Sequence, residues 1–70
     1  MNTRETLRKL AKLRLLRILK SLPPEYSFAA VGGKVISRDE AIRLVMEERD
    51  FGKELIEEEM RIIQERMRVV

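Results

Sequence analysis

The sequence contains no cysteine, no histidine and no tryptophan. Without cysteine the chain has no disulfide and no thiolate ligand for a metal. Without histidine it lacks both the commonest metal ligand in proteins and the commonest general base at neutral pH. Ser21, Ser27 and Ser37 therefore have no histidine or cysteine partner for nucleophilic catalysis. We predict a protein that is not an enzyme and that holds no cofactor and no metal.

No apolar run in the chain approaches the roughly 20 residues that a membrane-spanning helix needs. The N-terminal stretch is rich in leucine, but basic residues recur through it and interrupt the apolar centre that a secretory signal peptide requires. We therefore expect no transmembrane segment and a cytoplasmic location. Amide residues are scarce too, since Asn2 and Gln64 are the only two, and with abundant Arg and Glu this composition is typical of proteins from hot environments.

The chain has 70 residues, which is enough for one domain spanning 1–70. A core of this size is marginal, and such chains usually gain stability from a disulfide, a metal or a second subunit. Because cysteine is absent, a second subunit becomes the more important possibility.

Charge is divided unevenly along the chain. Residues 1–37 carry eight Lys or Arg and two acidic residues, a net +6, whereas residues 38–70 carry seven Lys or Arg and ten acidic residues, a net −3. Two interpretations fit this pattern. In the first, a basic N-terminal helix lies against an acidic C-terminal helix of the same protein. In the second, the basic half faces an anionic partner.

A capping pattern at the N-terminus predicts a first helix from Thr3 to Ser21. Asn2 can cap this helix with Glu5 three residues later, and a pair of prolines ends it shortly after Ser21. Its main apolar face consists of Leu7, Ala11, Ile18 and Leu22, flanked by Leu10, Leu15 and Leu19. Leu13 and Leu16 lie on the far side, among basic residues, which makes them candidates for a second contact surface.

The middle of the chain is its only β-like stretch. Short apolar runs at 27–31 and 34–37 flank Gly32 and Gly33, and two glycines suit a two-residue hairpin turn because they adopt positive φ readily. A single hairpin is barely stable alone in water. We therefore expect it to lie on the helices or to pair with a hairpin of another subunit.

Two further helices are predicted after the hairpin. Ser37 and the glutamate three residues later form a capping box that opens a second helix. Asp50 can then cap a third helix, and Gly52 weakens helix continuation between the two. A single bent helix from 38 to 68 is the competing interpretation. The elements together define an α+β, helix-dominated fold of order α-β-β-α-α, with one short hairpin between helix 1 and helix 2.

The C-terminal segment carries the clearest pattern, a row of apolar residues at alternating spacings of four and three. This heptad stripe consists of Ile56, Met60, Ile63, Met67 and Val70. A helix with this spacing packs on another helix, within the chain or in a second subunit. We do not expect a chain this short to cover the whole stripe, so we predict a helix-packed homo-oligomer. The two methionines also suit a heterologous protein partner.

Three consecutive glutamates, Glu57, Glu58 and Glu59, lie in the same segment. Adjacent residues of a helix point about 100° apart, so these carboxylates do not converge on one ion or one proton. We interpret them as part of a solvated acidic face.

Basic residues along the first predicted helix and beside the two glycines are candidate contacts to nucleic-acid phosphates. The candidates are Arg4, Arg8, Lys9, Lys12, Arg17 and Lys34. Aromatic residues are few, so no stacking platform for single-stranded nucleic acid is evident. A cationic, leucine-rich helix can also lie on an anionic membrane, or can simply pack in the core.

The residues from Lys34 to Met67 follow the order strand, helix, glycine-containing turn and longer helix. This order resembles that of ribbon-helix-helix DNA-binding dimers. The resemblance implies a dimeric regulator that contacts DNA. Members of that family usually have a basic or polar strand face and a polar Gly-x-Ser-like turn, whereas here the strand has one basic residue and 51–54 reads FGKE.

The sequence therefore indicates two kinds of function. The first is a small, non-enzymatic, self-associating interaction or regulatory protein that uses the heptad stripe, with Leu13 and Leu16 as a second contact. The alternative is a nucleic-acid-binding regulator that uses the basic first helix or the strand at Lys34. Binding that falls steeply with salt would identify the alternative.

Overall fold

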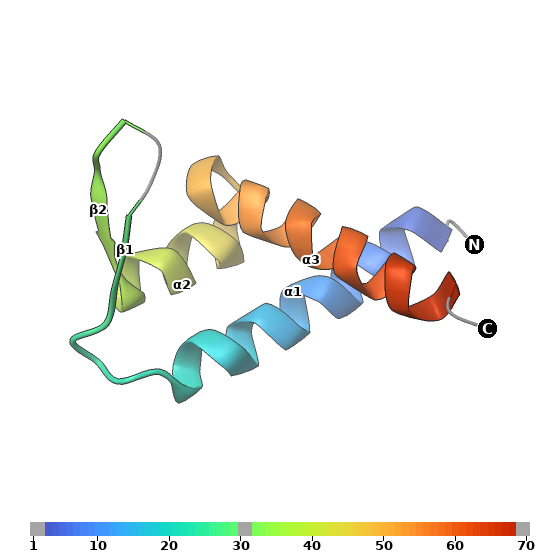
Figure 1. Cartoon of the computed structure of the whole chain (residues 1–70), viewed down its shortest axis with the longest axis horizontal. Helices are drawn as coiled ribbons and strands as arrows, with labels where there is room; N and C mark the ends of the chain where they lie inside the picture. Colours follow the sequence, from blue (N-terminus) through green and yellow to red (C-terminus); the bar gives the residue numbers. More distant parts are fainter. Residues whose placement is uncertain (1–2, 30–31, 69–70) are drawn as a thin grey trace.

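The computed structural model describes residues 3–29 and 32–68 of the chain. The elements follow in the order α1 (Thr3–Ser21), β1 (Ser27–Ala29), β2 (Val35–Ser37), α2 (Arg38–Glu47) and α3 (Asp50–Arg68). This confirms the predicted helix-dominated order, with one antiparallel hairpin between the first two helices. In Figure 1, α1 and α3 run antiparallel side by side, α2 packs against both, and the hairpin lies at the end away from the termini.

The first helix begins and ends where the capping residues and prolines predicted, although the proposed cap Asn2 lies outside the described residues. Its buried residues are Ala11, Leu15 and Leu19, which recur every four residues along one side. Three assignments to its faces were wrong. Leu10 and Ile18 are each 46% exposed, and Leu16 is half-buried and packs against the core. The cause is that α2 and α3 both pack on α1, so the covered arc is wider and rotated from the predicted one.

The register of the hairpin differs from the one that a two-residue turn at the glycines implies. Such a turn would place Phe28 opposite Ser37, whereas the structure pairs Phe28 with Ile36. Residues paired directly across an antiparallel ladder lie on the same face, and a slip of one residue moves every side chain to the other face. The observed register puts Phe28 and Ile36 together on the core side. Burial of these two side chains therefore outweighs the preference for the tightest turn.

The second helix starts at the predicted capping residue. The Ser37 hydroxyl accepts a hydrogen bond from the backbone N–H of Glu40 at 3.1 Å. The helix ends with Glu48 in the left-handed region, at φ 55° and ψ 47°. The N–H of Glu48 bonds to the carbonyl of Val45, and the N–H of Arg49 bonds to that of Leu44, which is a Schellman closure made without glycine.

The third helix is separate from the second, so the single bent helix is not the structure adopted here. Asp50 is the first residue of α3 and has φ 51°, and it does not precede the helix as a cap. The carbonyl of Arg49 accepts the first helical hydrogen bond, from the N–H of Lys53 at 3.2 Å. Gly52, in the first turn, is buried against the backbone of α2 at Leu44.

The core lies where the three helices meet and extends to the inner side of the hairpin. Its buried apolar residues are Ala11, Leu15, Leu19, Ile36, Ala41, Leu44, Val45, Ile56, Met60 and Ile63. None of the helices in the part of the chain that the structure describes has both the length and the apolarity needed to cross a bilayer.

Candidate functional site

The heptad stripe is divided between the interior and the surface. Ile56, Met60 and Ile63 face α1 and α2 and are at most 7% exposed, so the chain covers these three positions itself. Met67 is 76% exposed, and Val70 lies outside the described residues. Of the described part of the stripe, only Met67 is therefore directly accessible to a partner.

Met67 forms one wall of an apolar groove at the end of the α1–α3 pair. The groove has a volume of about 440 Å³ and is lined from α1 by Thr3, Thr6, Leu7 and Leu10 and from α3 by Gln64, Met67 and Arg68. Leu10 is 46% exposed beside it. This groove was not predictable from the sequence, because it depends on how α1 and α3 pack near the termini.

The side of α1 that faces away from the other helices continues this apolar surface. Leu13 is 67% exposed, as expected for a residue on the far side of the helix. Leu10, Leu13 and Arg17 follow one another at spacings of three and four and so share a face. Lys20 is also exposed one turn further on. We call Leu10, Leu13 and Met67 with the end groove the outer apolar surface.

Two of the residues predicted to contact nucleic acid, Lys12 and Arg8, instead contact the C-terminal end of α2. The ammonium of Lys12 lies 3.0 Å from a carboxylate oxygen of Glu48 and donates a second hydrogen bond to the carbonyl of Met46, also at 3.0 Å. The guanidinium of Arg8 lies 3.8 Å from the same carboxylate. Both contacts tie α1 to the C-terminal end of α2, where a cation also interacts favourably with the helix dipole.

These contacts act on the acid as well. The hydrogen bond from Lys12, assisted by the charges of Lys12 and Arg8, lowers the pKa of Glu48, although partial burial opposes the shift. The contacts with Lys12 and Arg8 therefore favour the charged form of Glu48. The backbone of this residue also adopts the left-handed conformation that ends α2.

Another ion pair joins α1 to α3 and involves one of the three consecutive glutamates. Glu59 is 8% exposed, and its carboxylate accepts a hydrogen bond from Nε of Arg14 at 3.0 Å. The prediction that Glu59 belongs to a solvated face was therefore wrong. A buried carboxylate needs a charged or hydrogen-bonding partner, and Arg14 supplies it from 45 residues away in the sequence. Among the described residues, no three potential metal-ligating side chains gather in one place.

The remaining predicted phosphate contacts do not form one patch. Arg4, Lys9 and Arg17 are spread along α1, which runs from the end with the termini toward the end with the hairpin (Figure 1), whereas Lys34 directly precedes β2. The predicted basic residues are therefore distributed among an intramolecular ion-pair cluster, the exposed side of α1 and the hairpin.

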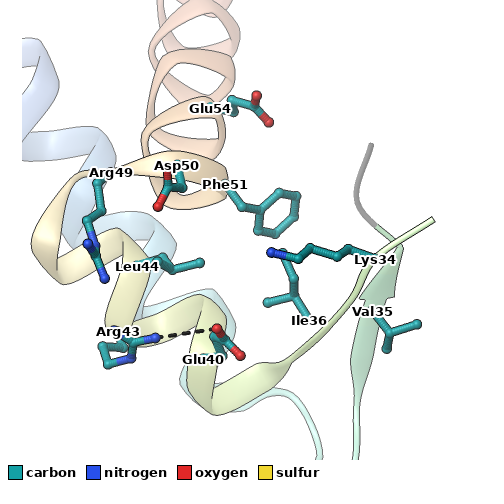
Figure 2. Close-up of a pocket in the computed structure, with 10 residues that line it drawn as sticks. All are labelled: Lys34, Val35, Ile36, Glu40, Arg43, Leu44, Arg49, Asp50, Phe51 and Glu54. Atoms are coloured by element: carbon teal, nitrogen blue, oxygen red, sulfur yellow. Dashed lines mark hydrogen bonds and ion pairs between the residues drawn. The ribbon is translucent and has the colours of Figure 1, made fainter. Parts of the chain in front are cut away.

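A second hollow, of about 450 Å³, lies between β2 and the α2–α3 turn. Figure 2 shows its apolar wall, made by Ile36, Leu44 and Phe51, and the Lys34 side chain reaching toward Phe51. Three basic and three acidic side chains line its rim, namely Lys34, Arg43 and Arg49 and Glu40, Asp50 and Glu54. A guanidinium nitrogen of Arg43 lies 3.4 Å from a carboxylate oxygen of Glu40. Because cations and anions balance, the rim does not select a ligand of either charge.

No protein-family model, no curated protein and no solved structure matches this chain. The functional argument therefore depends on the geometry of the surfaces alone.

Proposed function

We propose that the protein is a non-enzymatic interaction module that forms a homodimer through its outer apolar surface. The observation that carries this proposal is the exposure of Leu13 and Met67, at 67% and 76%, beside an apolar groove lined by α1 and α3. Isolated exposed apolar residues are ordinary, but a groove with large exposed side chains on its edge is typical of a contact surface.

Charge supports a second copy of the same chain as the occupant. The exposed side of α1 carries Arg17 and Lys20, while the exposed side of α3 carries Glu57. These three side chains lie outside the ion pairs that hold the three helices together. Each copy therefore presents both basic and acidic side chains, and two copies can pair them across a contact. A small domain with a marginal core also gains stability from such a contact.

Nucleic-acid binding stays a prediction, and the contacts of Arg8 and Lys12 favour the structural interpretation of the charge division over it. Both cations are directed at Glu48 and the end of α2. A phosphate that used them would have to break contacts within the fold.

The proposal is tested by size-exclusion chromatography with light scattering at high micromolar concentration. We expect a dimer for the unchanged chain and a shift to monomer for Leu13→Asp, because an unpaired charge would be buried at the contact. Val35→Asp is the matched control, since Val35 is 73% exposed on the hairpin, away from the outer apolar surface. A chain that stays monomeric throughout this range, or a dimer that both variants weaken equally, would contradict the proposal.

A further inference from the structure

The turn between α2 and α3 is short and holds two residues in an unfavourable conformation. Glu48 and Asp50 have φ of 55° and 51°, and only Arg49 separates them. The left-handed region is costly for residues with a side chain, although Asp tolerates it better than most. Both positions lie on the path that the chain must take to bring α3 back along α1.

The first residues of this turn favour a helix, since Glu47, Glu48 and Arg49 all have high helix propensity. Asp50 and Gly52 favour continuation less, but no proline blocks a helix through residues 47–52. A continuous helix through the turn would return Glu48 and Asp50 to negative φ. The bend is therefore imposed by contacts made elsewhere, and short hinge loops under strain are the usual origin of exchange between identical chains.

Those contacts lie in the groove between α1 and α2, which holds the buried side of α3. Ile56, Met60 and Ile63 fill it, and Glu59 pairs with Arg14 of α1. Lys12 closes the turn by donating hydrogen bonds to the carboxylate of Glu48 and to the carbonyl of Met46 in α2. Apart from the turn itself, these contacts would have the same chemistry if α3 came from another copy.

We propose that the groove between α1 and α2 is also a binding surface for the α3 helix of a second copy. The turn straightens, α2 and α3 become continuous, and two chains exchange their third helices. This goes beyond the homodimer described above, because it uses the buried side of α3 and does not require Leu13 or Met67.

Substitutions at the turn shift the equilibrium between the monomer and the exchanged dimer in opposite directions. Glu48→Gly and Glu48→Ala both remove the ion pair with Lys12, but only glycine adopts positive φ without cost. The equilibrium between the monomer and the exchanged dimer therefore lies further toward the dimer for the Ala variant than for the Gly variant. An ordinary left-handed penalty changes this equilibrium by about five-fold for each turn that straightens. Because two turns straighten together, the dimer dissociation constant changes by about twenty-five-fold. Asp50→Gly against Asp50→Ala gives the same comparison at an exposed position that leaves the Lys12 contact in place.

Cross-linking identifies which chain supplies α3. The chain has no cysteine, so Arg14→Cys with Glu59→Cys introduces the only two thiols, at a site where α1 and α3 touch. After concentration to the range in which dimers form, a short bismaleimide should give covalent dimers on a denaturing gel. The same sample held dilute before cross-linking should give only monomers with an internal link.

The outcomes separate this proposal from the surface homodimer. Covalent dimers whose amount rises with Glu48→Ala and falls with Glu48→Gly support exchange. A non-covalent dimer with only internal cross-links overturns exchange and leaves self-association through the outer apolar surface standing. Equal dissociation constants for the Gly and Ala variants at both positions overturn exchange as well. A chain that is monomeric in every variant overturns both.

Discussion

Gly52 of α3 lies directly on the backbone of Leu44 in α2. A Cβ at position 52 would overlap the carbonyl group of Leu44 and the backbone nitrogen of Val45, neither of which can move without displacing α2. The glycine therefore sets how closely the two helices approach. This closeness lets α3 follow α2 after a turn as short as the one at Arg49.

We expect Gly52→Ala to destabilise the fold by about 3 kcal/mol, because overpacking against a backbone outweighs the better helix propensity of alanine. Urea unfolding followed by circular dichroism measures the loss. Lys53→Ala, at the exposed neighbouring position, is the control and should change the free energy of unfolding little. An unchanged midpoint for Gly52→Ala would mean that α3 does not approach α2 this closely.

The same substitution should have different effects at two apolar positions. Ile63→Asp places a carboxylate in the core, where Ile63 is 7% exposed, and should unfold the chain. Leu13→Asp, at a residue that is 67% exposed, should leave the thermal midpoint of the monomer close to that of the unchanged chain. Melting curves at low micromolar concentration, where association is weak, test this contrast. Equal destabilisation by both changes would place Leu13 in the core.

Lys12 and Glu48 should show coupled contributions to stability. Lys12→Met and Glu48→Gln each remove the contact at 3.0 Å, so the double variant should be less destabilised than the sum of the two single variants. Because the pair is partly exposed, we expect a coupling free energy of about 0.5 kcal/mol that weakens in high salt. A cycle of four urea titrations measures it, and strict additivity would show that the pair does not form in solution.

The lowered pKa of Glu48 predicts a dependence of stability on pH. A carboxyl whose pKa is lower in the folded state than its ordinary value of 4.5 stabilises the fold above that value. This stabilisation is lost as the pH falls through the lowered pKa. The difference in unfolding free energy between the unchanged chain and Glu48→Gln should therefore be constant near neutrality and shrink below about pH 4.5. A difference that stays constant through this range would contradict the prediction.

Phe28 attaches the hairpin to the helices. Its ring lies 5.0 Å from that of Tyr26 and 5.8 Å from that of Phe51 on α3, measured between centroids. A two-stranded hairpin is marginal without such packing. Phe28→Ala should therefore release the hairpin while α1, α2 and α3 keep their contacts, which amide exchange resolved by residue can detect. Protection that falls equally in all three helices would contradict this.

Local signals predicted the elements well because each depends on a few neighbouring residues. The prolines after Ser21 and the hydroxyl of Ser37 act within one turn of a helix, so the first helix and the start of the second were predicted at the right residues. The role of Gly52 was not predictable in the same way. Its effect depends on the backbone at Leu44, which the sequence alone does not place.

The candidate surface was predicted less well, because burial depends on which helix supplies the partner. The stripe indicated helix packing but not whether α1 or another chain would cover Ile56 and Ile63. The exposure of Leu13 followed from its position on the far side of α1, whereas Leu16 was drawn into the core by the packing of two helices at once. Glu59 gave no signal of burial, since its partner Arg14 lies in the opposite half of the chain.

The separation of 45 residues between Arg14 and Glu59 has a consequence for synthesis on the ribosome. The buried side of α1 has nothing to pack against while only the first half of the chain has emerged. The core can close only after α3 has left the exit tunnel, so a nascent chain that has exposed only α1 and α2 keeps the groove between them open.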